Sequence, residues 1–295
     1  MSEWITPVLA WLTYLLGWLE MRMFVPIAGS LAAAFFGAYT AQRIIERRET
    51  RQKQSKEIRS TSVAITLALH VANTFIAMKK QHIRRLHEDY HRSKKEIVNR
   101  LKTRPVATEE RVFNFKADLE YLPLAELPTD HLQRIVADEI SVVARPLLLP
   151  SIIRQVVRSQ HDAVTARNRQ IDEFKKVSLL GGDFTAGFFG LDHPRGVDNR
   201  YGANLDAISA YTDDCIYFSI RLTNDLLEHG RTLQKKYEAR FKEKAPRITI
   251  ADFSKVEKDL LPPVDNYPEW EKMSSGLDVG RTSPKPLWKR LMRRV

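Results

Sequence analysis

The run from Met23 to Ala41, nineteen residues without a charge, constrains the fold of this chain more than any other feature. As an α-helix it would be roughly 28 Å long, close to the ~30 Å hydrocarbon thickness of a bilayer. It is the best candidate in the chain for a transmembrane helix. Small residues recur at every fourth position, and such a stripe would let a second helix pack closely. The stripe consists of Gly29, Ala33, Gly37 and Ala41.

The residues that follow this run indicate its direction. Residues 42–59, QRIIERRETRQKQSKEIR, hold seven basic and three acidic side chains, so the positive-inside rule places them in the cytoplasm. A cleaved signal peptide is the alternative, but there the basic residues would precede the apolar run, and Tyr39 fits a cleavage site poorly. The single cysteine, Cys215, suits a reducing compartment. We therefore expect an N-terminal anchor in a cell inner membrane, with the body in the cytoplasm.

The opening stretch, residues 4–19, has sixteen uncharged residues and a tryptophan at every seventh position. It would form a helix of only about 24 Å, which is short for a membrane span. With a tight turn at residues 20–22 it would be the first half of a helical hairpin in the membrane, which is the arrangement we favour. The alternatives are an amphipathic helix lying on the membrane surface and a helix in a soluble core.

The net charge of +11 is distributed unevenly. Residues 42–104 sum to +11 and residues 281–295 to +6, whereas residues 105–280 sum to −5. The chain has no recognised nucleic-acid-binding motif, and its basic stretches lack interleaved aromatic residues, so nucleic acid is not an expected partner. We expect instead membrane lipids, including anionic headgroups, and either self-association or a protein partner. No nucleotide-binding motif is present, and no cofactor is expected.

The remaining pattern predicts a mainly α-helical body. Apolar residues follow a 4-3 spacing from Ile58 to Leu101, and similar helices are expected after Asp130 and from about Asn204 to Lys244. Two alternating stretches, residues 111–122 and 246–252, could pair as a short two-stranded sheet. The predicted organisation is a membrane anchor (1–41), a basic stalk helix (42–104), an antiparallel helical-bundle body (105–271) and a basic tail (272–295).

One short motif within the stalk carries possible chemistry. His87, Glu88 and His91 lie in HEDYH, which resembles the H-E-x-x-H motif of zincin metalloproteases. The resemblance implies zinc held by the two histidines, with Glu88 as general base. Conceivable third ligands are Glu120, Glu126 and His131. Because the surrounding helix is strongly basic, we favour the other interpretation, an exposed cluster without a metal, and so no catalytic residue.

Residues 181–202, GGDFTAGFFGLDHPRGVDNRYG, hold six of the twelve glycines and are predicted to be a long loop between two helices. The loop is either a flexible connection or a ligand-binding segment, in which its phenylalanines would contact a membrane or a partner. The polar residues available to a ligand are Asp183, Asp192, His193, Arg195, Asp198 and Arg200.

The end of the chain, KPLWKRLMRRV, is predicted to be an amphipathic helix that settles on anionic lipid, with a disordered basic tail as the alternative. The residues expected at the lipid surface are Trp288, Lys289, Arg290, Arg293 and Arg294.

The stretch YTDDCIYFSIRLTNDLLEHGRTLQKKYEARFKEKAPRITIADFS resembles segments of uncharacterised bacterial membrane-associated proteins that have no assigned activity. The resemblance implies a bacterial inner-membrane setting. Together these features lead us to expect a non-enzymatic scaffold, sensor or oligomerising protein anchored in the membrane. The alternatives are a membrane-tethered zinc hydrolase that uses HEDYH and an effector that opens membrane pores.

Overall fold

The structure, a computed structural model, describes residues 5–103, 115–176, 182–194 and 196–272. In the first helix, side chains are described from Ala34 onward. The chain divides into two compact units, Met1–Lys56 and Glu57–Val295. Helix α1 (Ile5–Met78) contributes residues to both units.

The first unit is helical throughout its described residues. The helix continues through residues 20–22, so the hairpin that we predicted there is wrong. Its backbone hydrogen bonds are not interrupted by the charged residues at that point, and a helix needs no turn merely because charges interrupt its apolar run. Gly37 and Ala41 are exposed, and a Cβ added to Gly37 would meet no atom within 4 Å. The surroundings of Gly29 and Ala33 are not described by the structure.

Among the described residues, one helix near the N-terminus, Ala34–Thr103, contains a window long and apolar enough to cross a membrane by length and composition. Within the structure, 44% of that window is buried. A signal sequence and the core helix of a soluble protein pass the same test.

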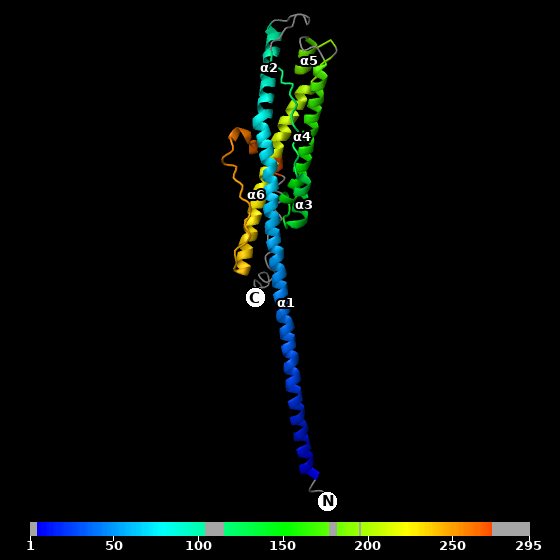
Figure 1. The fold of residues 1–295 in the computed structure, drawn as a ribbon, viewed down its shortest axis with the longest axis vertical. Coiled ribbons are helices and arrows are strands. Elements are labelled where there is room, and N and C mark those ends of the chain that lie inside the picture. Colours follow the sequence, from blue (N-terminus) through cyan, green and yellow to red (C-terminus); the bar gives the residue numbers. More distant parts are fainter. Residues whose placement is uncertain (1–4, 104–114, 177–181, 195, 273–295) are drawn as a thin grey trace, which may run out of the picture. The chain divides into compact units, whose positions relative to one another are not determined.

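The second unit is a bundle of long helices (Figure 1). One is formed by the end of α1 with η1 (Lys79–Ile83) and α2 (Arg84–Thr103). The other two are α4 (Arg145–Lys175) and α6 (Arg200–Phe241), which lie side by side. The shorter elements are α3 (Thr129–Glu139), α5 (Gly182–Phe189), η3 (Lys258–Leu260) and η4 (Val264–Asn266). The prediction of an all-α body is confirmed.

Helix α6 runs antiparallel to both of its long neighbours. Against α4, Asn204 near the start of α6 donates to Gln170 near the end of α4 (2.8 Å), whereas Asp225 pairs with Arg145 at the start of α4. Against the first helix, contacts from Asp206, Asp213 and His229 reach residues progressively earlier in the chain, namely His87, Lys79 and Glu57.

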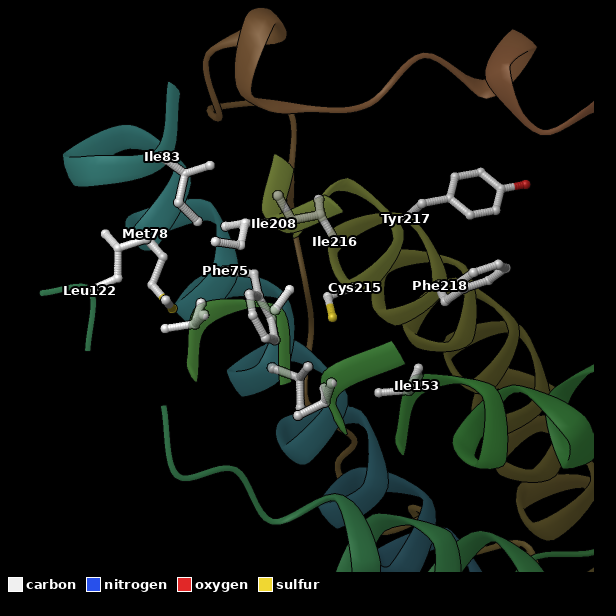
Figure 2. Close-up of a cluster of buried hydrophobic side chains, with 14 of the residues drawn as sticks. Phe75, Met78, Ile83, Leu122, Ile153, Ile208, Cys215, Ile216, Tyr217 and Phe218 are labelled. Carbon is white, nitrogen blue, oxygen red and sulfur yellow. The ribbon is translucent and has the colours of Figure 1, made fainter. Parts of the chain in front are cut away.

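The core lies where these three helices meet. Figure 2 shows Phe75 of α1 and Ile208 and Cys215 of α6 among its buried side chains. Cys215 has no exposed surface, and burial together with the nearby Asp214 carboxylate raises the pKa of its thiol well above the usual value. Cys215 is therefore a packing residue, in line with its apolar neighbours.

A π-helical turn, η1, sets the rotation of α2 relative to the end of α1. The buried stripe of the helix includes Val71, Phe75 and Met78, and it resumes at Ile83, five residues after Met78. An α-helical turn advances by three or four residues, so a regular helix would turn Ile83 away from the core. The wider turn absorbs the extra residue and returns Ile83 to the buried side.

Within the described part of the chain there are no strands, so the predicted two-stranded sheet is wrong. Residues 115–122 are extended along the bundle, and residues 246–252 pack on α1, where the backbone N–H of Thr249 donates to the Ser62 hydroxyl (2.9 Å). Both segments alternate because they lie on a helical surface with one side buried. An alternating pattern indicates that one side of a segment is buried, but it does not indicate whether a strand or a helix covers that side.

Candidate metal centre

The HEDYH motif lies in the first two turns of α2. Tyr90 is its buried residue, with 5% of its surface exposed, and its ring stacks on Phe189 of α5 with the centroids 5.6 Å apart. His87 and His91 lie one helical turn apart on the side of α2 that faces α6. The packing of Tyr90 therefore fixes the direction in which both imidazoles point.

Asp206, on the second turn of α6, meets both histidines. Its Oδ1 lies 2.9 Å from His87 Nε2 and 2.7 Å from His91 Nε2, and the two Nε2 atoms are 3.1 Å apart. Three potential ligand atoms thus form a small triangle that joins α2 to α6. A carboxylate and two imidazoles, each with a lone pair free when deprotonated, are a common ligand set for zinc.

The triangle has nearly the dimensions that a metal ion requires. With bonds of about 2.0 to 2.1 Å, neighbouring ligands in a tetrahedral zinc site lie about 3.4 Å apart. The three separations, 2.7 to 3.1 Å, are shorter than this, so side-chain rotation would have to open the triangle around an ion. The side of the triangle away from the helices is open, because 44% of the His91 side chain and 56% of the Asp206 side chain are exposed. A fourth position is therefore accessible to water or another ligand.

Close contact between α2 and α6 depends on a glycine. Gly202 lies one turn before Asp206, and a Cβ there would come within 2.5 Å of the Tyr90 hydroxyl. Burial raises the pKa of Tyr90 above its usual value, and the negative charge of Asp206 and the neighbouring Tyr201 add to the effect. Tyr90 therefore remains a neutral phenol beside the triangle.

Glu88 points toward a different feature, a cavity of about 530 Å³ that His87 also lines. Its other walls include two ion pairs, Lys79 with Asp213 (2.6 Å) and Arg84 with Asp259. Glu88 is exposed and is not a member of the triangle. Glu88 therefore lies outside the ligand set, as the general base of a zincin motif does.

The sequence identified both histidines but not the third member of the group. Of the residues we considered, His131 is bonded to Arg134 within α3 (2.8 Å), and Glu120 lines another cavity. Asp206 was missed because nothing in the sequence relates it to a motif more than a hundred residues earlier. The only available signal is that Asp206 lies beside the apolar face of an amphipathic helix, where a partner helix must pack.

Among the described residues, the paired polar side chains of the glycine-rich segment form two separate groups. Residues 182–189 are helix α5 and α6 begins at Arg200, so the prediction of a continuous loop is wrong. Asp183 is bonded to His193 (2.7 Å), whereas Asp198 pairs with Arg200, which also reaches Glu173. The hydrogen bond from Arg200 lowers the pKa of Asp198. Asp192 is exposed, and Arg195 lies outside the described residues.

The phenylalanines of this segment are core residues. Phe184, Phe188 and Phe189 are at most 4% exposed and pack with Phe115, Phe174 and Tyr201. They are therefore not available to contact a membrane, which was one of the two alternatives for this segment. The glycines are typical of a loop. Burial of the aromatic side chains between α4 and α6 stabilises the segment in a packed, partly helical form instead. The tail residues Trp288, Lys289, Arg290, Arg293 and Arg294 lie outside the described residues.

The fold and the site together define an all-α helical protein with a two-histidine, one-carboxylate cluster between two of its long helices. No family model, curated protein or solved structure matches the chain.

Proposed function

We propose that this protein is a membrane-anchored cytoplasmic helical protein that senses a divalent transition-metal ion, with zinc as the leading candidate. The observation that carries the proposal is the meeting of His87, His91 and Asp206, whose potential ligand atoms all lie within 4.8 Å of one another. Two imidazoles and one carboxylate favour zinc or a related first-row metal over calcium or magnesium, which prefer oxygen ligands.

A metal ion at this place would connect elements that are distant in sequence. The histidines belong to α2 and Asp206 to α6, 115 residues after His91. Solvent-exposed ion pairs contribute at most about 1 kcal/mol, so the triangle alone holds the helices together only weakly. A bound ion replaces these weak contacts with three coordination bonds, and the packing of α2 on α6 then depends on metal concentration. Such dependence is the physical basis of a sensor.

The membrane part of the proposal rests on the sequence. The charge-free run from Met23 to Ala41 and the basic residues 42–59 support an N-terminal anchor with the body in the cytoplasm. A role as a scaffold or oligomerising module is included in the proposal, because a helical sensor acts through the partner or second copy that it binds.

The metal is tested with purified protein that has been stripped with a chelator and titrated with zinc by calorimetry. We expect one zinc per chain, and an affinity at least about tenfold lower for His91→Ala and for Asp206→Asn. The matched controls are His70→Ala, an exposed histidine elsewhere in the body, and Asp192→Asn. No binding by the unaltered protein, or equal losses in the controls, would contradict the proposal.

The anchor is tested separately by fractionating cells that express the full chain. The protein is expected in the membrane fraction after high-salt washing, and a version that starts at Glu57, the first residue of the second unit, is expected in the soluble fraction. If the full chain were soluble, the anchor would be wrong while the metal site could still stand.

A zinc hydrolase is the second candidate, and the position of Glu88 favours it. Glu88 lines the cavity that His87 also lines, where it could take a proton from a metal-bound water. The test is hydrolysis of a fluorogenic peptide library by zinc-loaded protein. Activity that Glu88→Gln removes while zinc affinity is retained would make the protein an enzyme, whereas the sensor proposal expects no such activity.

A further inference from the structure

A second cavity, of about 490 Å³, lies on another side of α2 from the metal triangle. Its walls come from η1, α2, residues 116–122, α4 and α5. The volume falls in the range of small-ligand sites, roughly 300 to 1,000 Å³. None of the three members of the metal triangle lines it.

The floor of this cavity contains a buried guanidinium, that of Arg167 on α4. The side chain has no exposed surface. Its two terminal nitrogens donate to backbone carbonyls, Nη1 to Glu120 (2.8 Å) and Nη2 to Asp118 (3.2 Å), whereas Nε has no hydrogen-bond partner. The guanidinium also faces the Tyr201 ring, 5.7 Å from its centroid.

No carboxylate forms an ion pair with Arg167 among the described residues. Two backbone carbonyls accept hydrogen bonds from its terminal nitrogens but do not neutralise its charge, and a buried charge without an opposite charge is costly. A cation retained in this state attracts an anion to the adjacent cavity, because the low dielectric of the floor screens it weakly.

The rim of the cavity reinforces the charge of the floor. Arg85, Arg92 and Lys116 line it, together with three carboxylates. Of these, Asp89 lies between the two arginines, 3.4 Å from Arg85 and 3.0 Å from Arg92, and Asp118 accepts the backbone N–H of Glu120. Four cations against three carboxylates leave the lining with an excess positive charge.

The rest of the floor is apolar and aromatic. Phe188, Phe189 and Tyr90 line the cavity beside Leu86 and Leu122. These side chains are at most 8% exposed, and the aromatic rings pack on one another, so they keep water away from the guanidinium and offer no free face to a ligand. The cavity is therefore a site for an anionic group.

We propose that this cavity binds a small anionic molecule, such as a phosphate monoester. Its anionic group contacts Lys116 and Arg92 within the field of Arg167. The cavity is independent of the metal triangle, so the protein has a ligand site in addition to its proposed metal site.

The test is calorimetric titration of the full chain, in detergent and after chelator treatment, with adenosine monophosphate and adenosine. We expect the monophosphate to bind and adenosine, which lacks the negative charge, to bind at least about tenfold more weakly. Failure of the monophosphate to bind, or equal affinity for adenosine, would overturn the proposal.

Variants separate this site from general attraction to a basic protein. Lys116→Gln is expected to weaken the monophosphate about fivefold or more, whereas Lys235→Gln, which removes the same charge from an exposed position on α6, leaves it unchanged. Arg167→Gln is expected to abolish binding, with circular dichroism confirming the fold because Arg167 also holds residues 118–120. Equal losses in the two lysine variants would overturn the proposal. Lys116→Gln is expected to bind zinc as tightly as the unaltered protein. Loss of the anion site can therefore be distinguished from loss of the metal site.

Discussion

Tyr90 and Gly202 lie so close together that a Cβ on the glycine would come within 2.5 Å of the tyrosine hydroxyl. This contact is where α2 packs on α6, one turn from the residues of the metal triangle. Only a residue without a side chain allows the two helices to approach so closely. The glycine is therefore required by packing, although it lies near the start of a long helix, where glycine is otherwise unfavourable.

Gly202→Ala should push the Tyr90 side chain and α2 away from α6. Overpacking of this kind costs about 1 to 3 kcal/mol, and the shift should also weaken zinc binding, because Asp206 follows one turn later. Urea denaturation and zinc titration measure the two effects. Gly187→Ala is the matched control, since its Cβ would meet Phe174 at an ordinary 3.7 Å. An unchanged stability for Gly202→Ala would show that the helices are not packed as described.

Zinc should stabilise the folded body. At a free concentration one hundred times its dissociation constant, a ligand that binds only the native state adds about 2.7 kcal/mol to the free energy of unfolding. Thermal melting with and without zinc measures this, and Asp206→Asn should reduce the shift to a small fraction of its value. If Asp206→Asn kept the whole shift, zinc would be bound elsewhere in the chain.

The ion pair between Arg145 and Asp225 should contribute far more than an exposed pair. Asp225 accepts from both Nε and Nη2 of Arg145, at 2.8 and 2.6 Å, and the two side chains are only 16% and 10% exposed. Because removal of one partner leaves a largely buried charge, Asp225→Asn should cost about 3 kcal/mol in urea denaturation. The control is Asp130→Asn, whose partner Arg154 is 57% exposed, and it should cost at most about 1 kcal/mol. Similar costs for both variants would contradict this difference in burial.

Glu57 should make stability depend on pH in the acid range. Burial alone would raise its pKa, but hydrogen bonds from Ser141 and an interaction with His229 outweigh burial and lower it. A carboxyl group with a lowered folded-state pKa stabilises the protein above its unfolded pKa of about 4.3, and the contribution is lost as pH falls through the folded value.

We therefore expect Glu57→Gln to be less stable than the unaltered protein at pH 7, with the difference shrinking below about pH 4. Urea denaturation at a series of pH values measures the difference. Glu228→Gln, an exposed glutamate on α6, should show no such trend. A difference that grew on acidification would have the wrong sign for this explanation.

The π-helical turn should tolerate the loss of one residue. Deletion of Gln81 should convert η1 to an α-helical turn while Met78 and Ile83 both stay on the buried side, so stability should fall by no more than about 2 kcal/mol. Deletion of His70, in regular helix, rotates everything beyond it by about 100° and should unfold the body. Circular dichroism and thermal melting distinguish the two deletions, and equal damage would contradict the assigned role of the turn.

Much of the helical architecture could be predicted from the sequence. The apolar spacing located the long helices to within a few residues, because one face of each must be buried and the spacing indicates which one, but it did not locate α5. The hairpin at residues 20–22 and the two-stranded sheet were wrong for a shared reason. A local break or an alternation shows that exposure changes along the chain, but it does not show what covers the buried side.

The candidate site was also predictable only in part. HEDYH alone determined that two histidines would lie one turn apart on a helix, and the basic residues around them argued against a metal. Only the tertiary structure brought Asp206 to them, turned Glu88 toward a cavity and placed Arg167 beneath another. Local sequence fixes the period and the buried face of a helix because both depend on neighbouring residues. The partner that an exposed polar residue meets depends on how separate helices pack, and for α2 that was decided by a π-helical turn and a single glycine.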